Sequence, residues 1–82
     1  MTEQQIQRKR IKKFEEQGYY VIKLIKTNKN GIPDLVAIPR NSKVIFSEIK
    51  KKHGKVSALQ EYRLKELNDH GIKTEIYRGE EI

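Results

Sequence analysis

The chain of 82 residues contains no cysteine, and this absence constrains its fold more than any other feature. A disulfide framework and a thiolate metal site are both excluded, so the packing of apolar side chains must hold the fold together. A chain this short buries only somewhat more than half of the surface that it exposes when unfolded, which is enough for one small core. We therefore expect a single domain over residues 1–82, with any functional site near the surface or completed by a second subunit.

The charge of the chain is strongly positive. Eighteen Lys and Arg residues against eleven Asp and Glu residues give a net charge of +7. Such an excess predicts a polyanionic partner, of which nucleic acid is the first candidate. A membrane partner is not expected, because the segment Met1 to Gln17 is polar and no apolar run approaches a transmembrane length. That segment is also unlike a signal peptide, and together with the absence of cysteine this predicts an intracellular, cytoplasmic protein.

Hydrophobic periodicity predicts two helices. Ile6, Ile11 and Phe14 fall in one arc of a helix over residues 2–17, together with Glu3 and Arg10, if each residue turns by about 100°. The second helix opens at residue 57 and ends at residue 71, where a glycine is a natural terminator. A Ser at position 57 followed three residues later by a Gln matches a helix-opening capping box.

Four strands complete an α/β chain of the order αβββαβ. Aromatic and β-branched residues, or alternating polarity, predict strands over residues 19–26, 34–38, 43–50 and 72–78. The turn-like residues 39–42 predict a hairpin between the second and third strands. In the third strand Val44, Phe46, Glu48 and Lys50 are expected to share one face.

A hairpin turning near Arg40 would bring two carboxylates together. Asp34 begins one of its strands and Glu48 ends the other, so both are expected at the same end of the sheet. Lys50 lies two residues beyond Glu48, roughly 7 Å along the same face, with Ile49 turned to the other face. Two carboxylates and the Ile49 carbonyl oxygen are hard ligands suited to Mg²⁺ or Mn²⁺. A lysine beside them suits phosphodiester hydrolysis, where negative charge develops.

Three segments and one glutamine carry a resemblance to a known family. The segments are Asn30 to Leu35, Phe46 to Lys50 and Gly54 to Ser57, and the glutamine is Gln60. Together they resemble the VRR-NUC family, a branch of the PD-(D/E)XK nucleases that is found as stand-alone viral proteins and as domains of repair enzymes. The similarity spans nearly the whole chain.

The resemblance implies a fold, a site and an activity. The fold is a restriction-endonuclease-like core, a mixed sheet flanked by helices. Asp34 and Glu48 would be metal ligands, Lys50 the catalytic lysine and Gln60 a further site residue, with Glu3 as an additional candidate ligand. Stand-alone members are similar to Holliday junction resolvases in acting as homodimers, so the implied activity is endonucleolytic cleavage of branched DNA.

Structural explanations compete for several of these residues. Glu48 and Lys50 would form a surface salt bridge on an edge strand, Asp34 would be a turn residue, and Gln60 would only cap its helix. Gly31 would either supply a positive φ or allow DNA to approach the backbone. Other residues are assigned by their surroundings: Lys51, Lys52 and Lys55 as phosphate contacts, His53 and His70 as exposed polar residues, and Tyr19, Tyr20 and Tyr62 as core or interface packing.

The residues support two main hypotheses about function. The first is a homodimeric Mg²⁺- or Mn²⁺-dependent endodeoxyribonuclease with DNA as its partner. The second is a small basic module that binds nucleic acid within a replication or repair complex and performs no chemistry. A structural subunit of such a complex is a third, weaker candidate.

Overall fold

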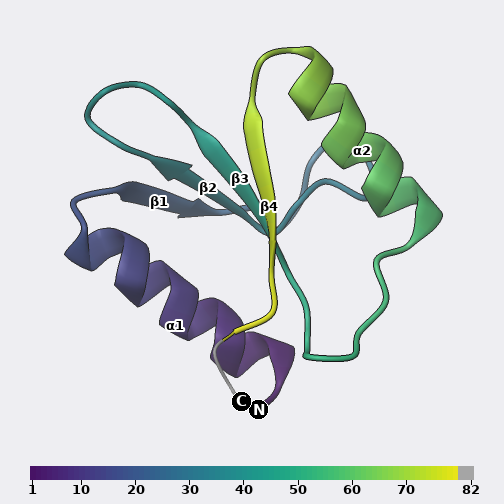
Figure 1. The fold of residues 1–82 in the computed structure, drawn as a ribbon, viewed down its shortest axis with the longest axis horizontal. Coiled ribbons are helices and arrows are strands. Elements are labelled where there is room, and N and C mark those ends of the chain that lie inside the picture. Colours follow the sequence, from purple (N-terminus) through teal and green to yellow (C-terminus); the bar gives the residue numbers. More distant parts are fainter. Residues whose placement is uncertain (80–82) are drawn as a thin grey trace.

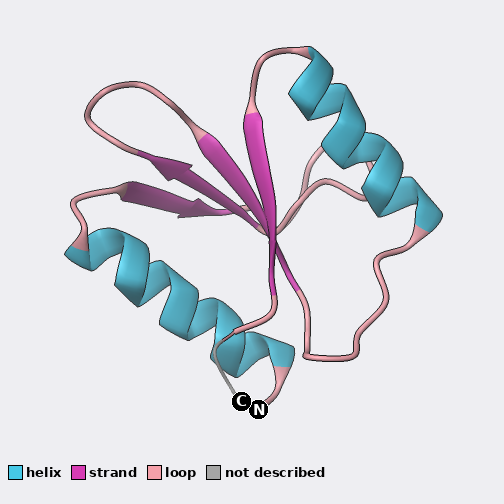
Figure 2. Cartoon of the chain, viewed as in Figure 1, coloured by secondary structure: helices cyan, strands magenta, loops and turns pink. Residues whose placement is uncertain are grey.

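The computed structural model describes residues 1–79 of the chain, which form two helices and four strands (Figure 2). The order αβββαβ is the predicted one. The elements are α1 (Glu3–Glu16), β1 (Tyr20–Lys23), β2 (Leu35–Ile38), β3 (Ile45–Ile49), α2 (Ala58–Asp69) and β4 (Lys73–Tyr77). Within residues 1–79, neither helix is long and apolar enough to cross a membrane.

Both helices begin with a capping box, in which two orphan N–H groups of the first turn are satisfied reciprocally. At α2 the Ser57 side chain accepts from the Gln60 N–H, and the Gln60 side chain accepts from the Ser57 N–H, as the sequence predicts. At α1 Thr2 and Gln5 form the same pair, which was not predicted. The N-terminal end of α1 is therefore fixed by hydrogen bonds.

The four strands form one mixed sheet in the order β1-β2-β3-β4 (Figure 1). β1, β2 and β3 pair antiparallel, whereas β4 lies parallel to β3 and is reached through α2. Figure 1 shows α1 and α2 on opposite sides of the sheet. A mixed sheet flanked by helices, as in a restriction-endonuclease-like core, is thus confirmed.

The third strand is shorter than expected. It runs from Ile45 to Ile49, so Val44 and Lys50, which were expected within it, flank its two ends. The residues between the two strands form a longer turn in place of the missing strand positions. Ser42 has a φ of 71° and its N–H donates to the Pro39 carbonyl. The Asn41 side chain accepts a hydrogen bond from the Lys43 N–H. These local bonds replace the ladder that two longer strands would have formed.

The core lies between α1 and one face of the sheet. Ile6 of α1 packs with Leu35 and Ile49, and Phe14 packs with Ala37 and Ile45. All six side chains are buried, and Val21 of β1 contacts both groups. Burial of apolar surface against α1 is therefore the main force that positions β2 and β3.

A polar network is embedded in this α1-facing layer. The Arg10 guanidinium donates two hydrogen bonds to the Glu75 carboxylate, at 2.9 and 2.8 Å, and the Ser47 hydroxyl donates a third at 2.6 Å. Arg10 also lies between the rings of Phe14 and Tyr77, 4.0 and 4.3 Å from their centroids. The network connects α1 to β3 and β4 with its charges paired, as burial requires.

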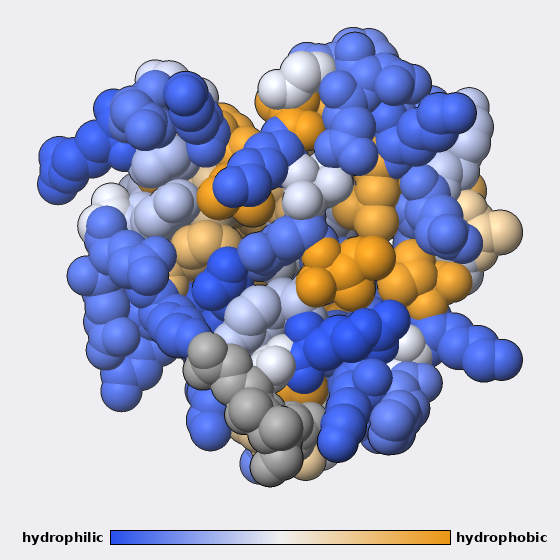
Figure 3. Space-filling model, in the orientation of Figure 1, coloured by the Kyte–Doolittle hydropathy of each residue, from blue (hydrophilic) through white to orange (hydrophobic). Residues whose placement is uncertain are grey.

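The opposite face of the sheet is only partly covered. α2 contacts β4, while Tyr20 and Ile22 of β1 are exposed by 70% and 42% and Ile76 of β4 by 43%. Tyr62 of α2 is also exposed. The prediction that Tyr20 and Tyr62 pack in the core of this chain is therefore wrong, whereas Tyr19 packs against Phe14. Figure 3 shows apolar side chains reaching the surface between polar ones on the face in view.

Candidate functional site

The β2–β3 register places Asp34 and Glu48 opposite each other. Leu35 pairs with Ser47, so the residues one step further along each strand meet across the hairpin. An Asp34 carboxylate oxygen accepts a hydrogen bond from the Ile49 N–H at 2.7 Å, and the Asp34 carbonyl accepts one from the Leu24 N–H at 2.8 Å. Asp34 is thus bonded to both neighbouring strands and is more than a turn residue.

The Glu48 carboxylate is buried on the sheet face that α2 covers. The side chain of Glu48 is 3% exposed and that of Lys50 is 13% exposed, so their contact is not a surface salt bridge. Lys50 Nζ lies 3.7 Å from Glu48 Oε2, and the same oxygen accepts a hydrogen bond from Gln60 Nε2 at 3.1 Å. Ile49 points to the other face and packs against Ile6, as the alternation of the strand predicts.

This environment raises the pKa of Glu48 to about 7. Burial of the carboxylate is the largest cause, and the neighbouring Asp34 carboxylate is the second, because two like charges side by side resist ionisation together. The Lys50 ammonium acts in the opposite direction and lowers the pKa of Glu48. A carboxyl group whose pKa is shifted by burial and by a neighbouring charge marks a candidate functional site.

Gln60 has both of the roles that its position suggests. Its side-chain oxygen accepts from the Ser57 N–H and its side-chain nitrogen donates to Glu48. The capping box therefore fixes the amide so that its nitrogen faces the carboxylate. The first turn of α2 and the end of β3 are joined through this one side chain.

Lys50 is fixed by its backbone as well as by its side chain. The Lys50 N–H donates to the Tyr77 carbonyl at 3.0 Å, which continues the pairing of β3 with the parallel strand β4. The ammonium group is therefore presented from a hydrogen-bonded backbone beside the two carboxylates.

The basic loop after Lys50 is held by an arginine that sequence analysis did not identify. Arg78 Nη1 lies 2.9 Å from the Lys51 carbonyl oxygen, 3.5 Å from that of Lys52 and 2.6 Å from that of Gly54. The side chains of Lys51, Lys52 and Lys55 are exposed. Nothing in the sequence signals this contact, because the residues are 24 to 27 positions apart and meet only through the parallel pairing of β4.

Glu3 lies near the same end of the sheet. It is exposed on the first turn of α1, and its carboxylate oxygen is 3.5 Å from the point where a side chain on Gly54 would begin. Its charge contributes to the raised pKa of Glu48, as the last and smallest of the causes. Glu3 is thus close enough to raise the pKa of Glu48. Within residues 1–79, it forms no hydrogen bond with Glu48 or Asp34.

Gly31 has a structural reason to be glycine. Its φ is +82°, and a Cβ here would lie 2.8 Å from Leu59 Cγ of α2. The adjacent Asn30 carbonyl accepts a hydrogen bond from Arg63 Nε at 2.8 Å. The loop that leads to Asp34 is therefore packed against α2, which accounts for Gly31 without contact with DNA.

The residues present suit a hard divalent cation. Between residues 1 and 79 no three His, Cys, Asp or Glu side chains form a cluster, and His53 and His70 are both exposed. The donors at this end of the sheet are the Asp34 and Glu48 carboxylates and the Ile49 carbonyl, which leave positions for water. Mg²⁺ binds through one or two carboxylates and keeps several waters, so the chemistry of this donor set matches it. The mutual repulsion of the carboxylates, which raises the pKa of Glu48, is what a bound cation would relieve.

A small mixed sheet between two helices, with a carboxylate pair and a lysine at the end of its hairpin, defines the restriction-endonuclease-like class. Comparison with known proteins makes the assignment narrower. The family model of the VRR-NUC domain matches residues 1–81. This chain belongs to the VRR-NUC family, as its sequence resemblance predicts.

A solved structure described as a VRR-NUC domain shares the fold. The two chains superpose with a TM-score of 0.85 and 24% sequence identity, over 94% of this chain and 84% of the other. No curated protein sequence matches this chain significantly.

Proposed function

We propose that this protein is a metal-dependent DNA endonuclease that hydrolyses phosphodiester bonds, with a preference for branched DNA such as Holliday junctions. The observation that carries the proposal is the buried Glu48 carboxylate, flanked by Asp34 and with Lys50 Nζ at 3.7 Å, at the end of a hairpin in a chain of net charge +7. Membership of a nuclease-type family supports it.

Asp34, Glu48 and the Ile49 carbonyl are proposed to hold Mg²⁺ or Mn²⁺. When bound, such an ion polarises a phosphoryl oxygen and lowers the pKa of its water. The Ile49 N–H keeps one Asp34 oxygen directed at β3. Glu3 is retained as a candidate ligand, because its first-turn position brings its charge within range of Glu48.

Lys50 and Gln60 are proposed to act beside the same oxygen of Glu48, Oε2. The Lys50 ammonium stabilises negative charge that develops at the phosphate and orients the attacking water. The Gln60 amide donates to one Glu48 oxygen and holds the carboxylate in a fixed orientation. Both groups restrict the site before substrate arrives, which lowers the reorganisation needed in the transition state.

Substrate would be bound through its phosphates. Lys51, Lys52 and Lys55 project from the loop next to Lys50, so they are proposed to contact the DNA backbone without reading bases. Gly31 is a weaker candidate for close approach of DNA, since its packing on Leu59 already explains it.

A homodimer is proposed to provide one active site for each of two strands. The support is the exposure of three apolar side chains on the α2 side of the sheet, Tyr20 and Ile22 on the edge strand β1 and Ile76 on the opposite edge strand β4. Large apolar side chains left exposed on one face are candidates for an interaction site. A second copy of the chain is the occupant that cleavage of a two-stranded branch requires.

The test is cleavage of a labelled four-way junction and of a linear duplex of the same sequence, in Mg²⁺, in Mn²⁺ and in EDTA. Wild type is expected to cut only with metal and to cut the junction faster. Lys50→Ala is expected to lose about 10²-fold or more of the rate, because a charge near the transition state is removed. Lys43→Ala, which removes an exposed lysine at the other end of the β2–β3 hairpin, is the matched control and should cleave normally.

One result would refute the proposed nuclease activity. Clear binding of both DNA substrates without cutting in either metal would leave the alternative, a basic module that binds nucleic acid without chemistry. That module needs the lysines of the loop but has no use for a buried Glu48 carboxylate beside Asp34, and this pair is why we favour the nuclease.

A further inference from the structure

A second group of cations lies on α1, outside the candidate site. Arg8, Lys9 and Lys12 recur at spacings of one, three and four residues, which places them on one side of the helix. The buried residues Ile6 and Phe14 occupy the other side. Arg8, Lys9 and Lys12 are exposed, so their charges face solvent.

The charges of Arg8, Lys9 and Lys12 form no ion pair within the described part of the chain. Among residues 1–79 the ion pairs are Arg10 with Glu75, Lys50 with Glu48 and Arg63 with Glu66. Arg8, Lys9 and Lys12 take part in none of them. Glu15 and Glu16 are the acids on the last turn of α1, and Glu3 is the acid on the first, so the turns between carry only positive charge.

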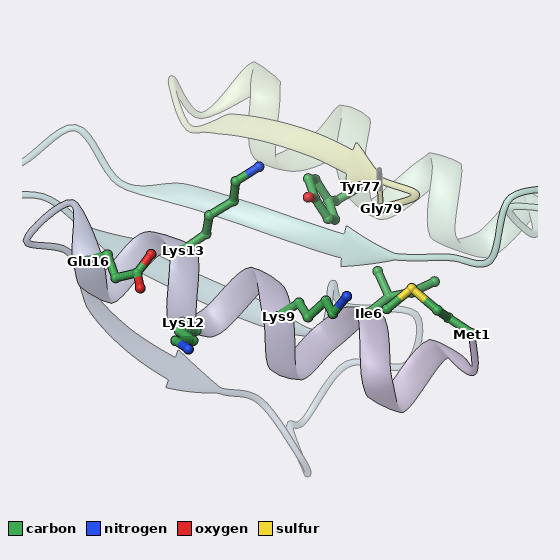
Figure 4. A pocket seen from close by; sticks show the side chains of 8 residues that line it. All are labelled: Met1, Ile6, Lys9, Lys12, Lys13, Glu16, Tyr77 and Gly79. Atoms are coloured by element: carbon green, nitrogen blue, oxygen red, sulfur yellow. The ribbon is translucent and has the colours of Figure 1, made fainter. Parts of the chain in front are cut away.

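The surface around these cations is hollowed. One groove of about 430 Å³ runs between α1 and the end of β4 and is lined by Lys9, Lys12, Lys13 and Tyr77 among others (Figure 4). A second hollow, of about 450 Å³, is lined by Met1, Gln5, Arg8, Lys9 and Lys12. Lys9 and Lys12 border both hollows, so a polyanion lying across α1 would meet them from either side.

The first turn of α1 lies beside the basic loop of the candidate site. The Glu3 carboxylate is 3.5 Å from the point where a side chain on Gly54 would begin, and a Cβ on Gly79 would lie 3.4 Å from Ile6. Arg78, which precedes Gly79, holds the loop carbonyls. The exposed cations of α1 and the lysines of the loop are therefore two separate basic surfaces, with the Glu3 carboxylate at the junction of α1 and the loop.

We propose that the exposed side of α1, with Arg8, Lys9 and Lys12 as its main contacts, is a second surface for the phosphate backbone of double-stranded DNA. The complementarity of three exposed cations with a polyanion identifies this occupant. The inference rests on the proposed function for the identity of the polymer, but it concerns binding and requires no cleavage. Backbone contacts of this kind carry no sequence information and serve to position the duplex.

The test compares two variants that lose the same charge in different places. Arg8→Gln/Lys9→Gln/Lys12→Gln removes three cations from α1, and Lys43→Gln/Lys65→Gln/Lys73→Gln removes three exposed lysines from the hairpin, α2 and the start of β4. Binding of a four-way junction and of a linear duplex is measured in EDTA, where no metal-dependent cleavage occurs, over about 50 to 200 mM salt. The salt slope counts the phosphates that each variant no longer neutralises.

The α1 variant is expected to bind about tenfold or more weakly, with a salt slope less steep by about 2 to 3, because each lost phosphate contact contributes about 0.9 to the slope. The control variant should keep nearly the slope of wild type. Equal effects of the two variants would overturn the proposal, since net charge alone would then explain them. Retention of DNA binding by the α1 variant, with loss of binding to phosphatidylserine vesicles, would also overturn it in favour of a membrane surface.

A second measurement needs no variant. Acetylation of wild-type lysines with and without DNA, read by mass spectrometry, is expected to show protection of Lys9 and Lys12 and none at Lys43, Lys65 and Lys73. Reactive Lys9 and Lys12 in the complex would contradict the proposal. Both measurements report binding and neither requires cleavage. Absence of cleavage by wild type would therefore refute the nuclease without contradicting the α1 surface.

Discussion

At the scale of single residues, the surroundings of Glu48 oppose ionisation of its carboxyl group. It is buried beside the Asp34 carboxylate, and its pKa is raised to about 7 from an ordinary value of 4.5. A carboxyl group with a raised pKa in the folded state binds its proton more tightly there than in the unfolded chain. Without metal, the contribution of Glu48 to stability is therefore lost as pH rises from about 4.5 through about 7.

Glu48→Gln should reverse this loss. The quantity to compare is the free energy of unfolding of the variant minus that of wild type, measured in EDTA. This difference should be larger at about pH 8 than at about pH 4 by about 3 kcal/mol, since one pKa unit corresponds to about 1.4 kcal/mol. Urea unfolding at the two pH values measures the difference, and Glu15→Gln controls for the loss of one exposed carboxylate. A difference that stays constant with pH would show that the Glu48 carboxylate is not destabilised by its surroundings.

Gly31 and Gly71 provide a matched pair at this scale. Both have positive φ, +82° and +80°, but a Cβ at Gly31 would lie 2.8 Å from Leu59 whereas a Cβ at Gly71 would have nothing within 4 Å. Gly71→Ala should cost about 1 kcal/mol of unfolding free energy through backbone strain, and Gly31→Ala about 1 to 2 kcal/mol more through the clash. Thermal or urea unfolding measures both. Equal losses would mean that Leu59 moves aside freely.

At the scale of elements, the parallel strand β4 organises the segment that follows the candidate catalytic lysine. Its last residue accepts the Lys50 N–H, and the next residue, Arg78, binds the carbonyls of the loop. Fixing the loop in advance reduces the entropy lost when its lysines bind phosphate.

Arg78→Lys keeps the charge and removes the guanidinium, so it isolates this role. We expect the KM for DNA cleavage to rise by about threefold to tenfold with little change in kcat, since one or two ordered side chains each account for about 0.5 to 1.5 kcal/mol of binding. The salt slope of binding should stay the same because no charge is lost. A large fall in kcat at unchanged KM would indicate that Arg78 acts on the chemistry and not on the loop.

The elements also show which parts of the fold and site were predictable. The hairpin and its facing carboxylates followed from local signals, namely the strand pattern of residues 34–38 and 43–50 and the turn residues 39–42 between them. The capping box of α2 is local as well. The contacts of Arg10, Arg63 and Arg78 were not predicted, because their partners lie 65, 33 and up to 27 residues away and no local pattern encodes such pairs.

At the scale of the whole molecule, the two faces of the sheet differ in how they are covered. α1 buries one face, with Ile6 and Phe14 almost inaccessible, while β1 leaves Tyr20 and Ile22 in solvent on the other. The uncovered face is the surface on which the proposed homodimer depends.

Sedimentation provides the check on the dimer. Wild type should sediment as a dimer at micromolar concentration, and Ile22→Glu should shift it to monomer, because a charge would be buried without a partner. Ile25→Glu, which alters a residue that is 84% exposed beyond the end of β1, should leave the dimer intact. A monomeric wild type, both alone and with DNA, would remove the dimer from the proposed function.

The parallel pairing of β4 also sets an order of events during synthesis. Asp34, Glu48 and Lys50 leave the ribosome well before Tyr77 and Arg78, which supply the hydrogen bonds for Lys50 and for the loop after it. A nascent chain that stops short of Tyr77 thus has its acidic and basic groups but lacks the strand that fixes them. The arrangement delays assembly of the candidate site until nearly all of the described chain has been made.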